Sequence, residues 1–125
     1  MTRTMRYDLQ YDPEAAVIRV ATHGTIDLAS LRQMLAELKA ASRKHDCARY
    51  LLDHTDSDHR LGVTEIYHQP NVFSDLGFTW SDKAAIVFAT EDADFQFFED
   101  VACNRGYRVR VFTDVTRAME WLTAE

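Results

Sequence analysis

Residues that could do chemistry are concentrated in one short segment, directly after the apolar run at residues 50–52. An apolar run that meets polar groups without a spacer is typical of a buried strand that delivers side chains to the rim of a sheet. In α/β folds this rim is where ligands collect. The polar members of this segment are Asp53, His54, Asp56, Ser57, Asp58 and His59.

One interpretation of these residues is a divalent-metal site. His54, Asp56 and His59 would supply imidazole and carboxylate ligands, which suit zinc and similar ions. Their spacing matches no established metal motif. The three residues are therefore weak candidates for metal ligands, and we expect no cofactor.

Covalent and acid–base chemistry fit the same residues less well. A receiver-like phosphoacceptor at Asp53 would need a lysine at the end of the last strand, where Phe112 and Thr113 stand instead. Asp53 and His54 cannot act as an acid–base pair, because neighbours along a strand point to opposite faces. No motif of a serine hydrolase, zinc protease, phosphate-binding loop or dinucleotide-binding loop occurs. We therefore expect no enzymatic activity.

The elements that position these residues follow from hydrophobic periodicity. Alternation over residues 5–12 and β-branched residues over 16–22 predict a hairpin, with Gly24 breaking its second strand. Apolar residues at helical spacing then predict a helix that Asp27 caps and that ends near residues 43–45.

The middle of the chain is predicted to be less regular. A third strand is expected over residues 48–54, with the remaining polar residues in a loop. A short helix should run to about Gln69 and be followed by a break or by a kinked second turn to Leu76, because Pro70 fits poorly inside a helix. A buried strand over residues 83–89 and a helix capped by Thr90 follow.

The chain is predicted to end with a strand over residues 107–112 and a helix capped by Asp114. The resulting order, β-β-α-β-α-β-α-β-α, predicts an α/β fold. Its sheet should be mixed and five-stranded, parallel apart from one strand, with about four flanking helices. Residues 1–125 are expected to form a single domain, because no repeat or linker interrupts them.

Aromatic residues form a second group of candidates, in and after the irregular segment 63–80. Their number exceeds what the buried face of a single helix requires. Core packing beneath a loop explains them, and the alternative is an apolar cleft or an exposed patch for a partner. The residues that would line this cleft or patch are Tyr67, Phe73, Phe78, Trp80 and Phe98.

Composition narrows the classes of partner. The net charge of −6 argues against a nucleic-acid partner, which needs a basic face. No run approaches the roughly 20 apolar residues of a membrane span, and the first residues lack the apolar core of a signal peptide. Cys47 and Cys103 are far apart and are expected to be reduced. We expect a cytoplasmic protein.

The organisation also resembles a known family. The stretches that carry the likeness are residues 13–18, Gly24, 28–31, 51–53, 83–87, 107–114, Ala118 and 121–122. With them the chain resembles the STAS/SpoIIAA-like superfamily, specifically the bacterial STAS/SEC14-type single-domain proteins, over nearly its whole length.

This resemblance implies a SpoIIAA-like fold and a non-enzymatic regulatory module that acts through protein–protein association, with a homodimer expected. Signalling STAS domains carry a phosphorylated Ser or Thr at a helix start, in an Asp-Ser-Ser-Gly-like motif. Ser57 is the matching candidate phosphosite. Two features depart from the motif: Asp58, which directly follows Ser57, would repel a phosphate, and the glycine comes only at Gly62. The SEC14-type likeness adds an alternative, a small apolar or lipid-like ligand in a cleft near residues 63–80.

Overall fold

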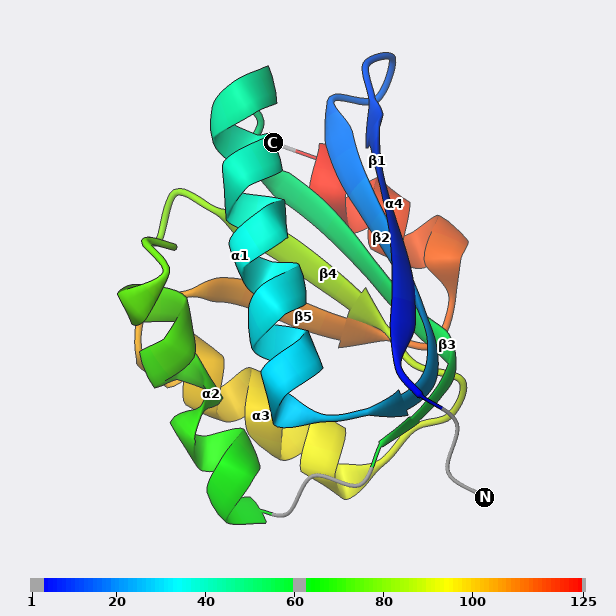
Figure 1. The fold of residues 1–125 in the computed structure, drawn as a ribbon, viewed down its shortest axis with the longest axis vertical. Coiled ribbons are helices and arrows are strands. Elements are labelled where there is room, and N and C mark those ends of the chain that lie inside the picture. Colours follow the sequence, from blue (N-terminus) through cyan, green and yellow to red (C-terminus); the bar gives the residue numbers. More distant parts are fainter. Residues whose placement is uncertain (1–3, 60–62, 125) are drawn as a thin grey trace.

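The computed structural model describes residues 4–59 and 63–124, without the side chains of residues 59, 63, 64, 66–68 and 70. Strands and helices alternate in the predicted order after an N-terminal hairpin (Figure 1). The elements are β1 (Arg6–Asp12), β2 (Val17–Ile26), α1 (Leu28–His45), β3 (Arg49–His59), α2 (Val63–Asp75), β4 (Lys83–Val87), α3 (Ala93–Asn104), β5 (Arg108–Phe112) and α4 (Val115–Thr123).

The five strands form one sheet in the order β1-β2-β3-β4-β5. β1 and β2 are antiparallel, and the other neighbouring pairs are parallel. This arrangement confirms the predicted mixed sheet. Helices α1, α2 and α3 lie on one side of the sheet and α4 on the other (Figure 1).

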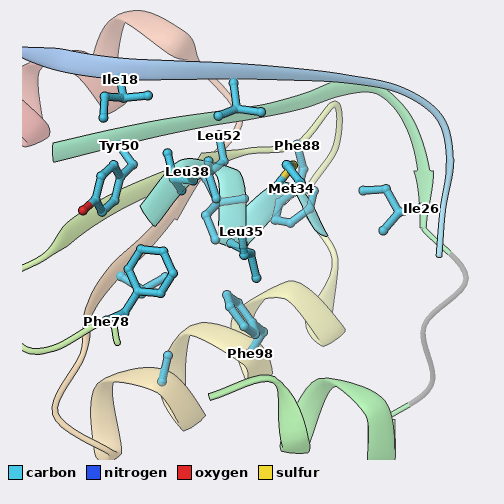
Figure 2. Packing of buried hydrophobic residues seen from close by; sticks show 14 of the residues in the cluster. Ile18, Ile26, Met34, Leu35, Leu38, Tyr50, Leu52, Phe78, Phe88 and Phe98 are labelled. Carbon is cyan, nitrogen blue, oxygen red and sulfur yellow. The ribbon is translucent and has the colours of Figure 1, made fainter. Parts of the chain in front are cut away.

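Each central strand supplies side chains to both layers, because successive residues point to opposite faces. Leu52 and Tyr50 of β3 pack with α1, whereas Leu51 packs with α4. In the larger core, Leu35 from α1 and Phe98 from α3 point toward one another beneath the sheet (Figure 2). Burying each such side chain contributes roughly 1.5–3 kcal/mol, so this face carries much of the stability.

Helix α2 runs from Val63 to Asp75 and passes through Pro70. Of the two continuations predicted after Gln69, the break is therefore wrong, whereas a helical segment that reaches almost to Leu76 is present. A proline removes one backbone donor within a helix, but tertiary packing supplies most of the stability of a helix in a protein. Here Phe73, in the last turns, makes edge-to-face contacts with Phe98 and Tyr107.

The prediction that Gly24 breaks the second strand is also wrong. β2 continues to Ile26, with Gly24 paired to Ser57 of β3. The φ of Gly24 is 91°, and a Cβ at this position would lie 2.3 Å from the carbonyl oxygen of Thr4. Glycine is needed here for the close approach of a neighbouring backbone, and not for a turn.

β3 is longer than predicted and extends to His59, so the polar residues after His54 lie in a strand and not in a loop. The register against β2 shifts along the way. Ala21 pairs with Asp53, but His23 pairs with Asp56, so His54 and Thr55 together stand opposite Thr22. This β-bulge inserts an extra residue and interrupts the alternation, which is why the sequence pattern there is not that of a strand.

Helix capping is confirmed at two of three predicted positions. Asp27 accepts a hydrogen bond from the backbone N–H of Ser30, and Asp114 accepts one from that of Thr116, each at 2.8 Å. The cap of α3 is Asp92 and not Thr90, because β4 ends at Val87 and the helix begins later than predicted. Both cysteines are free, as expected.

Candidate functional site

The β-bulge brings together three polar side chains, one from β2 and two from β3. The Oγ1 atom of the buried Thr22 lies 2.6 Å from Nδ1 of His54 and 2.6 Å from Oγ of Ser57. We call these three residues the Thr22 network. Ser57 therefore lies within β3, with its hydroxyl hydrogen-bonded to Thr22 of β2. Helix α2 begins only at Val63. The candidate phosphosite does not lie at a helix start.

Asp53 also has a structural partner at the bulge. Its Oδ1 accepts hydrogen bonds from the backbone N–H of Thr55 at 3.0 Å and from the hydroxyl of Thr55 at 2.7 Å. Asp58 lies further along β3, exposed and opposite Thr25.

The three candidate metal ligands are not brought together among the side chains that the structure describes. His54 contacts Thr22, whereas Asp56 contacts His23, the next residue of β2, which points to the opposite face. The side chain of His59 lies outside the described residues. Within the described part of the chain no group of three His, Cys, Asp or Glu residues could hold a metal ion.

On the opposite face, His23 lies between two carboxylates. Its Nδ1 is 2.7 Å from Oδ2 of Asp56, and its Nε2 is 3.4 Å from Oδ2 of Asp8. The hydrogen bond with Asp56 is the main reason that the pKa of His23 is raised above its ordinary value. Sequence reasoning missed this pairing, because it depends on the register of three strands.

The raised pKa of His23 predicts a pH-dependent contribution to stability. Because the folded-state pKa exceeds the unfolded one, the stabilisation is fully present below about pH 6.5 and is lost as pH rises through the folded pKa. Asp56→Asn should lower the His23 pKa, measured by NMR titration of the imidazole, and flatten the pH dependence of unfolding. Glu14→Gln, in the exposed turn, serves as the control. An unchanged His23 pKa in Asp56→Asn would contradict this assignment.

A cavity of about 120 Å³ lies beside the Thr22 network, between the sheet and helices α1, α2 and α3. Its wall is mostly apolar. Two buried polar side chains, His54 and Gln69, also line it, and the exposed residues Asp92 and Asp94 border it at the start of α3. The apolar lining consists of Ile26, Leu31, Leu35, Leu52, Phe73, Ile86, Phe88, Phe95 and Phe98.

The aromatic candidates separate into different environments. Phe73 and Phe98 both line the cavity, with ring centroids 6.0 Å apart. Phe78 is buried against Tyr50 beside a second cavity of about 40 Å³. Trp80 lies on the loop before β4 and is 72% exposed. The side chain of Tyr67 lies outside the described residues.

Gln69 was not among the candidates that the sequence suggested. Gln69 and Phe73 are four residues apart on α2 and therefore share a face of that helix. This spacing was the available signal, but the break or kink predicted after Gln69 concealed it.

At the other end of the sheet, a buried polar cluster surrounds Asp82. Its carboxylate accepts hydrogen bonds from the hydroxyl of Tyr50, from the backbone N–H of Thr79 at 2.8 Å and from Nζ of Lys39 at 3.4 Å. Burial, followed by the hydrogen bond with Asp82, raises the pKa of Tyr50. The cluster anchors the loop that leads into β4.

Comparison with solved structures places this architecture among known folds. An anti-sigma factor antagonist from Mycobacterium paratuberculosis matches with a TM-score of 0.67, over 97% of this chain and 96% of its own, at 12% sequence identity. The fold is SpoIIAA-like. An uncharacterised protein with a SpoIIAA-like fold from Shewanella loihica matches with a TM-score of 0.55, over 98% of this chain and 96% of its own, at 16% identity.

These matches confirm the STAS/SpoIIAA-like fold that the sequence resemblance implied, and identities this low support the fold alone. The finer SEC14-type likeness stays a prediction. No protein-family model matches the sequence, and no curated protein matches it significantly. Among the helices of the described residues, none has the length and apolarity to cross a bilayer.

Proposed function

We propose that this chain is a cytoplasmic, single-domain, non-enzymatic regulatory module that acts through protein–protein association. The observation that carries the proposal is the fold match to an anti-sigma factor antagonist over nearly the whole of both chains. An anti-sigma factor is therefore the class of partner to test first.

The arrangement of polar groups at the sheet rim supports a non-enzymatic role. Asp53, Thr22 and Ser57 are engaged in hydrogen bonds that hold the bulge. Asp92 and Asp114 cap helices. Each of these groups thus already stabilises the fold through a hydrogen bond, which supports a structural role for them.

The exposure of Trp80 supports the proposed association, with Trp80 as a residue that contacts the partner. It is 72% exposed, and tryptophan is enriched among the residues that dominate protein interfaces. Its loop is held in place, because the guanidinium of Arg108 donates to the backbone carbonyls of Trp80 and Ser81 at 2.9 and 2.8 Å. A large apolar side chain on a fixed loop loses little entropy when a partner binds.

Trp80→Ala is expected to weaken partner binding by about tenfold or more, while stability changes by less than about 0.5 kcal/mol. The full chain would be immobilised and cross-linked to proteins of the source cell, which are then identified by mass spectrometry. Direct titration with the purified partner follows. Leu28→Ala is the control, since Leu28 is also apolar and exposed but lies on α1. Equal recovery of every protein by wild type and Trp80→Ala would contradict this role.

A homodimer is part of the proposal. Light scattering coupled to size exclusion should give about twice the chain mass of 14.4 kDa. A clean monomer at micromolar concentration would remove the homodimer and leave the heterologous partner to be tested.

Ser57 is the proposed regulatory phosphosite, and its surroundings indicate how a phosphate would act. The added charge would break the hydrogen bond to Thr22 and would lie beside the buried side chains of Thr22 and His54, which cannot neutralise it without rearrangement. Ser57→Ala should cost about 1 kcal/mol of unfolding free energy through the lost hydrogen bond, and Ser57→Glu about 1–3 kcal/mol. Urea denaturation measures both. Ala36→Glu, exposed on α1, is the control; Ser57→Glu should be clearly less stable than it.

A further inference from the structure

The side chain of Gln69 is unusual for a buried amide. It is 8% exposed and lines the cavity between the sheet and α1, α2 and α3. It makes no hydrogen bond with any residue that the structure describes. Buried amides are nearly always hydrogen-bonded in native proteins, to protein, water or ligand. Gln69 therefore points to an occupant of the cavity that can donate or accept a hydrogen bond.

The imidazole of His54 is the second buried polar group in the cavity wall. Its orientation is fixed by the hydrogen bond of Nδ1 to Thr22 and by the contact with the ring of Phe88, whose centroid is 5.6 Å away. Two buried polar side chains in a mostly apolar wall, with Asp92 and Asp94 at its exposed edge, resemble the composition of a small-molecule site, where few polar groups orient the ligand.

The size and the aromatic lining of the cavity limit the ligand. An apolar cavity of about 150 Å³ accommodates one benzene molecule, and this cavity has about 120 Å³. This volume is close to that of one six-membered ring and is too small to enclose a lipid chain or a nucleotide. Phe73 and Phe98 meet edge to face, an arrangement that a third ring can extend.

The acidic residues at the edge of the cavity disfavour an anionic ligand. Asp92 and Asp94 both line the cavity at the start of α3. Their carboxylates repel a ligand carboxylate at neutral pH, and the apolar wall disfavours the burial of any charge.

We propose that the cavity binds a small neutral molecule with one aromatic ring and one hydroxyl or amide group. The polar group hydrogen-bonds to the amide of Gln69, and the ring lies against Phe73 and Phe98. This site goes beyond the proposed association function, because Trp80 does not line the cavity.

Phenol, benzoate and toluene are the probes, and binding to the full chain is followed by shifts of its backbone amide signals in NMR titrations. Phenol should bind about tenfold more tightly than benzoate, with shifts centred on Phe73, Phe88 and Phe98. Gln69→Leu should weaken phenol binding about fivefold and leave toluene binding equal or tighter. Gln33→Leu, exposed on α1, should change neither affinity.

Three results would overturn the proposal. They are no binding of phenol to the wild type, as expected if the cavity holds only water; shifts away from the cavity; or equal phenol affinity in wild type and Gln69→Leu. If Gln69→Leu does not fold, Leu31→Phe replaces it, because Leu31 is half-buried at the cavity and a larger ring fills the space. This variant should lose both phenol and toluene binding, and retained binding would refute the site.

Discussion

Leu38→Ala is expected to lower the free energy of unfolding by about 2–5 kcal/mol. Leu38 lies on the buried face of α1, is 1% exposed, and belongs to the core that includes Tyr50 and Leu52 of β3. Truncation removes apolar contacts and leaves a cavity that a close-packed core cannot fully close. Urea denaturation, with an unchanged dependence on denaturant, measures the loss.

The same helix provides the control for this prediction. Leu28 is 42% exposed in the first turn of α1, so Leu28→Ala should change stability by less than about 0.5 kcal/mol. Similar losses in the two variants would mean that α1 does not pack on the sheet through the face described.

Asp82→Ala is expected to cost about 3 kcal/mol, because it removes the shared acceptor of three buried or half-buried donors, of which the hydroxyl of Tyr50 keeps a second acceptor in Oγ of Ser42. The donors are the hydroxyl of Tyr50, the backbone N–H of Thr79 and the ammonium of Lys39. The loop before β4 should loosen as a result, which hydrogen exchange of its backbone amides would detect.

Two variants separate the contributions around Asp82. Tyr50→Phe removes a single donor and should cost about 1–3 kcal/mol. In Asp82→Ala the pKa of Tyr50 should fall from its raised value, since the neighbouring carboxylate is gone while burial remains. Ultraviolet titration of the tyrosines measures this shift. A loss below about 0.5 kcal/mol in Asp82→Ala would show that the cluster does not hold the loop.

The order of strands and helices could be predicted because each element is encoded by its own residues. The spacing of Met34, Leu35 and Leu38 defines the buried face of α1 whatever lies opposite it. Asp27 and Asp114 cap helices through hydrogen bonds to residues two or three positions away. The α/β class and the single antiparallel pair then follow from the order of the elements.

The candidate site could be predicted only in part. The aromatic character of Phe73 and Phe98 marks both as candidates in the sequence, and both line the cavity. Gln69 and its isolation were not recognised, because burial of a polar side chain on α2 depends on α1, α3 and the sheet packing around it. His54 was considered with Asp56, but the bulge turns the two side chains to opposite faces.

By itself, then, the sequence determined whatever depends on neighbours within a few positions: the succession of elements, two helix caps and the apolar faces. Only the tertiary structure decided the rest. The carbonyl of Thr4 explains Gly24, packing of Phe73 keeps α2 helical beyond Pro70, and the register of β2 against β3 turns a polar loop into a bulged strand. Each of these outcomes arises from contacts between segments far apart in the chain, which local periodicity does not encode.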